Sequence, residues 1–309
     1  MLSKVWMDCA RSKTVVSNGP NAWLLDDGTR LHLQHGPIDL LIEAIGSKAQ
    51  VRLAYEQAVT AFNTVLNTLA DQLPVLRSQF VMQRYTDFNG DVAVRMRNAV
   101  IPFLKLPLTP MIAVAGAVAD YILECLTKER ELTRAQVNNG GDIALYLAPG
   151  SQVRIGICSN LSQSSVPRDV ITLNSNDSVR GIATSGWQGR SFSLGVADAV
   201  TVLSDCAASA DCAATLIANA VDVPGSEKVT RVPANTLLPD TDLEGQLVTT
   251  DVQMLDPSER AIALQAGMRQ AQIYIDKGNI RCAYLHLQGD THVVYSKCLL
   301  SQHAKGCHS

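Results

Sequence analysis

The chain has 309 residues, of which 47% are hydrophobic and 18% are charged, and it carries a formal net charge of −3. This composition is typical of a globular protein with a large core and excludes an intrinsically disordered one. The small net charge gives no reason to expect a nucleic acid or an anionic membrane surface as a partner.

The spacing of the cysteines and the hydropathy of the chain indicate in which cellular compartment the protein lies. The eight cysteines show no CxxC spacing, which favours reduced thiols over a disulfide framework or a zinc site. The longest apolar stretch, residues 111–118, is too short to span a bilayer, and no signal peptide is visible. We therefore expect a cytoplasmic protein.

The first predicted elements are antiparallel strands, followed by helices. Alternating hydrophobic residues predict a hairpin with arms at residues 22–25 and 29–34 and a further strand at residues 38–45. From Ser47 the hydrophobic period changes to three and four residues, which is typical of an amphipathic helix. The helices predicted in this part span residues 47–73, 91–100 and 111–126.

A strand that begins at residue 134 ends in the polar stretch Asn138, Asn139, Gly140, Gly141, Asp142. The glycines permit positive φ angles and close approach of a ligand to the backbone. The asparagine amides can donate and accept at once, as the edge of a flavin or purine requires. We interpret the stretch as a ligand-binding turn, and the alternative is a β-bulge. Downstream, residues 143–148 and 153–158 are predicted to pair as a hairpin.

A second polar turn follows a predicted strand at residues 179–183. Thr184, Ser185 and Gly186 offer hydroxyl and backbone donors that suit a phosphate or carboxylate. Arg190, which is followed by Ser191, could grip such an anion with two parallel hydrogen bonds. Two alternatives stay open: Thr-Ser-Gly is also ordinary turn chemistry, and Arg190 could pair with Asp198. An Ala-rich segment that extends to Val221 is predicted to be helical.

The composition changes after Val221, where several prolines and acidic residues predict an irregular connection. A capping signal at Asp256 and Glu259 predicts a helix over residues 257–277, and a hairpin with arms at 281–288 and 292–296 follows. We therefore expect a core of residues 1–222 and a C-terminal extension of residues 223–309 that packs on it.

Three motifs, in order, resemble the ApbE-like superfamily, whose best-known members are FAD:protein FMN transferases. They are the helical stretch 113–120, the stretch 137–143 that contains Asn-Asn-Gly-Gly-Asp, and residues 183–186 followed by Ala-Asp-Ala at 197–199. The sequence from His35 to Val221 is most similar to an uncharacterised bacterial and archaeal branch of this superfamily. The resemblance implies an α+β fold of ApbE-like architecture, with antiparallel sheets packed by helices, and FAD or FMN as ligand.

The sequence departs from the transferase pattern in three places. Transferases of the superfamily hold a divalent metal partly with an Asp and a Thr four residues later. Here Asp198 is matched to that Asp, but Val202 stands at the Thr position. Ala115 stands where those enzymes carry a Lys, and residues 190–194 replace their His-Ile-Ile-Asp-Pro stretch. These departures speak against a divalent metal and against FMN transfer.

Our leading hypothesis is therefore a protein that binds a flavin nucleotide or a similar anionic heterocyclic ligand, with any transferase activity altered. The candidate ligand-binding residues are Asn138, Asn139, Gly140, Gly141, Asp142, Gly186, Arg190 and Ser191. The candidate catalytic residues, if the chain is an enzyme, are Asp198, Ser185 and Thr184.

Two other classes of function are kept open. The first is a metal-independent hydrolase or lyase that acts on a small carboxylated heterocycle, with Ser185 or Thr184 as nucleophile and His35 as base. The second is a non-enzymatic accessory protein whose last third docks a partner. In every case we expect a small-molecule ligand or protein partner, neither nucleic acid nor membrane, and a homodimer.

Overall fold

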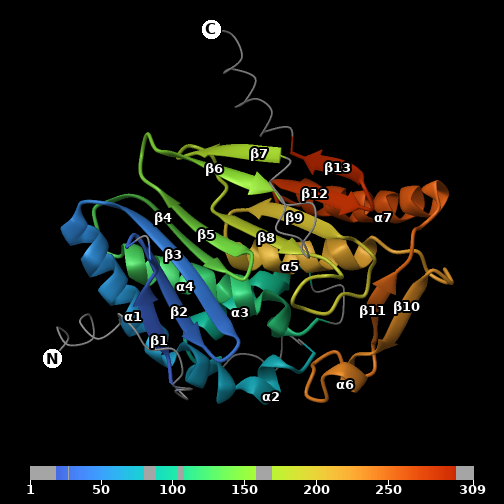
Figure 1. The fold of residues 1–309 in the computed structure, drawn as a ribbon, viewed down its shortest axis with the longest axis horizontal. Coiled ribbons are helices and arrows are strands. Elements are labelled where there is room, and N and C mark those ends of the chain that lie inside the picture. Colours follow the sequence, from blue (N-terminus) through green and yellow to red (C-terminus); the bar gives the residue numbers. More distant parts are fainter. Residues whose placement is uncertain (1–18, 27, 80–87, 104–107, 158–168, 297–309) are drawn as a thin grey trace, which may run out of the picture.

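The computed structural model describes residues 19–26, 28–79, 88–103, 108–157 and 169–296. One antiparallel sheet of nine strands runs through the molecule, in the order β1-β2-β3-β4-β5-β8-β9-β12-β13 (Figure 1). Its strands are β1 (Asn21–Leu24), β2 (Arg30–His35), β3 (Ile38–Gly46), β4 (Leu132–Asn139), β5 (Asp142–Leu147), β8 (Gly181–Ser185), β9 (Ala199–Ser204), β12 (Cys282–Leu287) and β13 (Asp290–Tyr295).

Four long helices cover one face of this sheet, and each packs mainly against two neighbouring strands. Helix α1 (Lys48–Ala70) packs on β2 and β3, α4 (Val114–Thr127) on β4 and β5, α5 (Ala207–Ala220) on β8 and β9, and α7 (Pro257–Asp276) on β12 and β13. The shorter helical segments are α2 (Leu73–Leu76), α3 (Asp91–Val100), η3 (Ile101–Phe103), η4 (Pro110–Ala113) and α6 (Ala234–Leu237).

Two small sheets complete the structure: β6 (Gln152–Ile157) pairs with β7 (Asp169–Asn174), and β10 (Val229–Pro233) pairs with β11 (Leu247–Val252). Side chains of β6 and β7 share a second apolar cluster with Leu145 of β5 and Ile182 of β8. Because successive residues of a strand face opposite sides, Ala144 joins the helix-side core while Leu145 faces this second cluster. The expected α+β class, with antiparallel sheets and helices, is confirmed.

The capping and periodicity arguments located most elements correctly. The Ser47 hydroxyl accepts the Gln50 backbone N–H at the start of α1 (3.3 Å), and Asp256 and Glu259 form a capping box at the start of α7. The last third is not spatially separate from the sheet, because β12 pairs with β9. The division into residues 1–222 and 223–309 stays an interpretation.

The predicted hairpin of residues 143–148 and 153–158 is wrong. β5 pairs with β4 and β8, whereas β6 pairs with β7. The two-residue turn Gly140–Gly141 joins β4 directly to β5 and so fixes the first neighbour of β5. Both glycines have positive φ angles, +66° and +120°, so this stretch is a tight hairpin turn and not a bulge.

One described stretch, Pro110–Thr127, is long and apolar enough to cross a membrane by length and composition, with a mean hydropathy of 1.4, but half of it is buried inside the structure. It comprises η4 and α4, and α4 lies between α1, α5 and the sheet. This is the position of a core helix.

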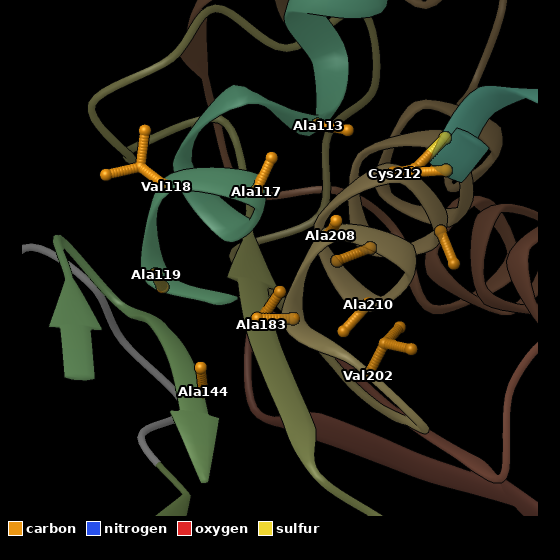
Figure 2. Packing of buried hydrophobic residues seen from close by; sticks show 14 of the residues in the cluster. Ala113, Ala117, Val118, Ala119, Ala144, Ala183, Val202, Ala208, Ala210 and Cys212 are labelled. Carbon is orange, nitrogen blue, oxygen red and sulfur yellow. The ribbon is translucent and has the colours of Figure 1, made fainter. Parts of the chain in front are cut away.

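Small residues let α5 approach its neighbours closely. Figure 2 shows Ala117 of α4, Ala208 of α5 and Ala183 of β8 where these elements meet. A Cβ added to Gly116 of α4 would lie 2.3 Å from the carbonyl oxygen of Ala207, a separation that a real side chain does not reach. The first turn of α5 is thus held tightly against α4, and this fixes the direction of the side chains that α5 presents further along.

Candidate functional site

A cavity of about 530 Å³ opens between α1, α2 and α4 on one side and the ends of β4, β5 and β8 on the other. Small-molecule sites have volumes of roughly 300–1,000 Å³, so a nucleotide-sized ligand fits. Its apolar lining includes Leu66, Leu69, Leu73, Met111, Val114 and Val118. Its polar lining includes Arg77, Asn139, Asp142, Thr184, Ser185, Arg190, Ser191, Asp211 and Thr215.

The two polar turns predicted from the sequence meet in this cavity. They come together because β5 and β8 are neighbours in the sheet, with Ile143 opposite Ile182. The predicted residues that line the cavity are Asn139, Gly140, Asp142, Thr184, Ser185, Gly186, Arg190 and Ser191. Asn138, Gly141 and Asp198 are not among the lining residues.

Asparagine side chains hold the β4–β5 turn in place. Oδ1 of Asn138 accepts the backbone N–H of Gly141 (2.9 Å), and Nδ2 of Asn139 donates to the carbonyl of Ala115 on α4 (3.0 Å). Asn138 therefore stabilises the turn, while Asn139 ties the turn to the helix behind the cavity.

Two carboxylates from different elements, Asp142 of β5 and Asp211 of α5, line the cavity. Both lie deep in the protein and keep partial exposure towards the cavity. Burial raises the pKa of Asp211 to about 7, although the backbone N–H groups of Gly116 and Ala115 oppose this. Burial, and then repulsion by Asp211, raises the pKa of Asp142, against the Thr184 backbone N–H. The pair is therefore poised to take up a proton or a cation.

Helices α4 and α5 cap each other through carboxylates. The two oxygens of Asp120 on α4 accept the N–H groups of Ala207 and Ala208 at the start of α5, each at 2.9 Å. In return, Oδ2 of Asp211 accepts the N–H of Gly116 in the first turn of α4 (3.0 Å). This exchange satisfies donors that a helix start leaves unpaired, and it directs the Asp211 carboxylate to the cavity.

Removing one side of this exchange should destabilise the protein. Asp120→Ala leaves two N–H groups at the start of α5 without their acceptor, so we expect it to lower the free energy of unfolding by about 2 kcal/mol. Asp276→Ala, at an exposed position of α7, is the matched control and should change it by less than about 0.5 kcal/mol. Urea denaturation measures both, and equal midpoints would contradict the capping role of Asp120.

Asp198, a predicted catalytic residue, holds two loops together. Its Oδ1 accepts Trp187 Nε1–H (3.1 Å), and its Oδ2 accepts the Gln288 backbone N–H (2.5 Å). In the part of the chain that the structure describes, it forms no ion pair with Arg190, so the predicted alternative of an internal pair is absent. Thr184, another predicted catalytic residue, shares a hydrogen bond with Thr201 of β9 (2.9 Å). The catalytic assignments stay predictions.

The sequence reasoning missed Asp211 and Thr215. They are four residues apart on α5, so both side chains lie on one face, and both line the cavity. The same spacing of four residues between an Asp and a Thr was matched at Asp198, but there Val202 stands at the position of the Thr. The sequence does contain a signal for this pair: Ala210-Asp211-Cys212 is a second Ala-Asp motif, and Thr215 stands four residues after its Asp.

Arg77, the residue directly after α2, was also missed, because α2 has only four residues and gives no periodic signal. His35, the base of the hydrolase hypothesis, is buried at the end of β2 and stands edge-on to Phe62, with ring centroids 6.3 Å apart. It is not among the residues that line the cavity beside Thr184 and Ser185, so nothing in this arrangement favours the hydrolase hypothesis.

The donor set at the carboxylate pair suits a hard divalent cation. Among the described residues, no group of three or more His, Cys, Asp or Glu side chains could hold a metal ion, and the described cysteines are free thiols. Magnesium commonly takes only one or two carboxylates, with waters and substrate phosphates filling the other positions. Asp142, Asp211 and the Thr215 hydroxyl therefore fit Mg²⁺ and do not fit a closed zinc site.

Comparisons of the sequence relate the chain to one family and to several archaeal proteins. A family model described as AbpE bacteria matches residues 22–293. A UPF0280 protein of Methanosarcina acetivorans is 39% identical over 177 residues, which are 57% of this chain and 66% of that protein. The chain spans between half and two thirds of the length of the first curated relatives it matches.

Solved structures show similarity over most of the chain at low identity. The ApbE protein of Thermotoga maritima is 12% identical, with 91% of this chain and 99% of that chain covered and a TM-score of 0.47. The flavinyl transferase ApbE of Pseudomonas stutzeri is also 12% identical, with 93% and 98% covered and a TM-score of 0.39.

Proposed function

The chain belongs to the AbpE bacteria family, and from this premise we propose that it binds a flavin nucleotide, or a closely similar anionic heterocyclic ligand, together with a divalent cation. The membership confirms the ApbE-like relationship expected from the three motifs. The site of binding in this proposal is the cavity of about 530 Å³.

The observation that carries the proposal is the buried carboxylate pair beside Thr215. Asp142 and Asp211 repel each other, and among the described residues no cationic side chain lowers either pKa. Two unneutralised carboxylates are costly in the interior, so a protein keeps them where a cation or a proton takes part in function. When bound, the divalent cation supplies positive charge that neutralises the pair and attracts the phosphates of a nucleotide.

The apolar lining of the cavity is the support for a planar ring system in this proposal. Leucines of α1 and α2, together with Met111 and Val118, give an apolar surface on which an isoalloxazine or purine ring could lie. Asn139 and the Gly140–Gly141 turn bring amide and backbone groups to the polar edge of that space.

The proposal is limited to binding. Ala115, which lines the cavity, has no amine where transferases of the superfamily carry a Lys, and residues 190–194 lack their His-Ile-Ile-Asp-Pro stretch. The chain's own groups can exclude water with the apolar wall, orient phosphates with hydroxyls and guanidinium groups, and hold a proton on Asp142 or Asp211. The cytoplasmic location and the homodimer stay expectations.

Calorimetric titration of the purified chain with FAD, FMN and ADP, in Mg²⁺ and separately in EDTA, tests the proposal. We expect FAD or FMN to bind in Mg²⁺ and to bind at least about tenfold more weakly in EDTA, because the carboxylates then repel the phosphates. At a ligand concentration of about 100 Kd the free energy of unfolding should rise by about 2.7 kcal/mol. Absence of binding by all three compounds in Mg²⁺ would refute the proposed ligand class.

A further inference from the structure

Two arginines line the same cavity as the Asp142–Asp211 pair but come from other segments of the chain. Arg77 follows the last turn of α2, and Arg190 lies in the loop after β8. Neither guanidinium group forms a hydrogen bond or an ion pair within the part of the chain that the structure describes, although the backbone N–H of Arg77 donates to the carbonyl of Leu73 (2.9 Å). A guanidinium group presents five donors in a planar fork that matches a carboxylate or a phosphate.

The positive and negative groups of the cavity are separated. Among the described residues, Asp142 and Asp211 form no ion pair with Arg77 or Arg190, although all four line the same cavity. The arginines are therefore free of the carboxylates that share their cavity, and their donors are available to a ligand.

The β4–β5 turn contacts the side chain of Arg190 through Gly140. A Cβ added to Gly140 would lie 3.1 Å from Nη1 of Arg190 and 3.7 Å from its Cζ, so the guanidinium group rests against the bare Cα of this glycine. Gly140 has a φ angle of +66°, which favours glycine, and its missing side chain also leaves room for the arginine. The two sequence motifs are thereby joined into one binding surface.

We propose that Arg77 and Arg190 form an oxyanion subsite, distinct from the Asp142–Asp211 pair, that recognises a phosphate or carboxylate group of the ligand. This deepens the proposed function and rests on it for the identity of the complete ligand. A ligand that satisfies both subsites carries an anionic group for the arginines and a second group, such as a cation-bound phosphate, for the carboxylates. Riboflavin, which has neither, should bind poorly.

The subsite is tested with inorganic pyrophosphate in EDTA, which removes the divalent cation from the experiment. We expect pyrophosphate to bind to the wild type, and Arg77→Gln and Arg190→Gln each to weaken it roughly 10- to 100-fold, because one charge-assisted contact is lost. Arg190→Lys should also weaken it, since an ammonium group cannot reproduce the fork. Arg154→Gln, at an exposed position of β6, is the matched control and should leave the affinity unchanged.

The contact between Gly140 and the side chain of Arg190 is tested by a double-mutant cycle on these two residues. Gly140→Ala should weaken pyrophosphate binding several-fold in the wild type but have no further effect in Arg190→Gln, because it acts through the arginine. Gly28→Ala is its control: Gly28 has the same φ angle of +66°, but nothing lies within 4 Å of its added Cβ. An equal loss in both backgrounds would show that Gly140 does not position Arg190.

The outcomes separate this proposal from the proposed function. Pyrophosphate binding that depends on both arginines supports the subsite even if FAD and FMN fail to bind, in which case only the proposed ligand class falls. Asp211→Asn should tighten pyrophosphate binding in EDTA, since it removes a negative charge that repels the anion and leaves both arginines in place. If pyrophosphate does not bind, or binds equally well to Arg77→Gln and Arg190→Gln, the subsite is overturned.

Discussion

Asp211→Asn should make the ligand-free protein more stable at pH 8 while removing the effect of Mg²⁺ on nucleotide binding. The pKa of Asp211 is about 7 in the folded protein and near its ordinary value of 3.8 in the unfolded chain. The folded state therefore binds the proton more tightly. The stability that this proton provides is fully present below about pH 4 and is lost as the pH rises through 7.

Asparagine avoids this loss because its amide stays neutral, and its Oδ1 can still accept the Gly116 N–H. At pH 8 we expect Asp211→Asn to raise the free energy of unfolding by roughly 2–4 kcal/mol, with no gain near pH 4. Loss of the carboxylate also removes its repulsion of Asp142, although burial still raises the pKa of that group.

Urea denaturation at a series of pH values, in EDTA, measures this effect. Asp276→Asn, an exposed carboxylate on α7, is the control and should reproduce the wild-type pH profile. Calorimetry with FAD or FMN in Mg²⁺ and in EDTA should give the same affinity for Asp211→Asn in both buffers. A variant that is less stable than the wild type at pH 8 would show that Asp211 is a structural group and not a strained functional one.

Gly181→Ala should cause the largest loss of stability in the chain. Gly181 begins β8, and a Cβ there would lie 1.9 Å from the carbonyl carbon of Cys206 and 2.2 Å from the N of Ala207. These are backbone atoms at the start of α5, so no side-chain rotation can relieve the clash. The helix would have to move away from the sheet, and we expect a loss of more than about 3 kcal/mol or a failure to fold.

Gly245→Ala is the matched control, because Gly245 has neither a positive φ angle nor any atom within 4 Å of an added Cβ. It should differ from the wild type by less than about 1 kcal/mol. Guanidinium chloride unfolding and the yield of folded protein, judged by circular dichroism, measure both variants. Equal midpoints for Gly181→Ala and Gly245→Ala would contradict the close packing of α5 on β8.

The sequence predicted the elements well because each depends on residues near one another. The buried positions Leu31 and Leu33 alternate along β2, and the capping box at Asp256 lies within one helical turn. The pairing of β6 could not be predicted in this way. Both β5 and β7 are close to β6 in the sequence, and the local pattern does not decide between them, whereas the structure pairs β6 with β7.

The site was predicted in part for the same reason. Thr184 and Arg190 lie in a turn that can be recognised from its local chemistry. Asp211 lines the cavity from α5, which is joined to α4 by hydrogen bonds that involve Asp120 and Gly116, and this is a tertiary relation. Arg77 lines the cavity from the position directly after α2, and a helix of four residues has no periodicity that would signal this.

The place of β9 in the sheet constrains how the chain can be made. All six residues of β9 are buried, and one of its two neighbours, β12, begins at Cys282, nearly eighty residues after β9 ends. On the ribosome, this apolar edge therefore stays without its partner until most of the last third has been synthesised. Unpaired apolar edges invite association with other chains. Translation pauses between Ser204 and Cys282 should favour aggregation of the nascent chain, and the sheet can close only near the end of synthesis.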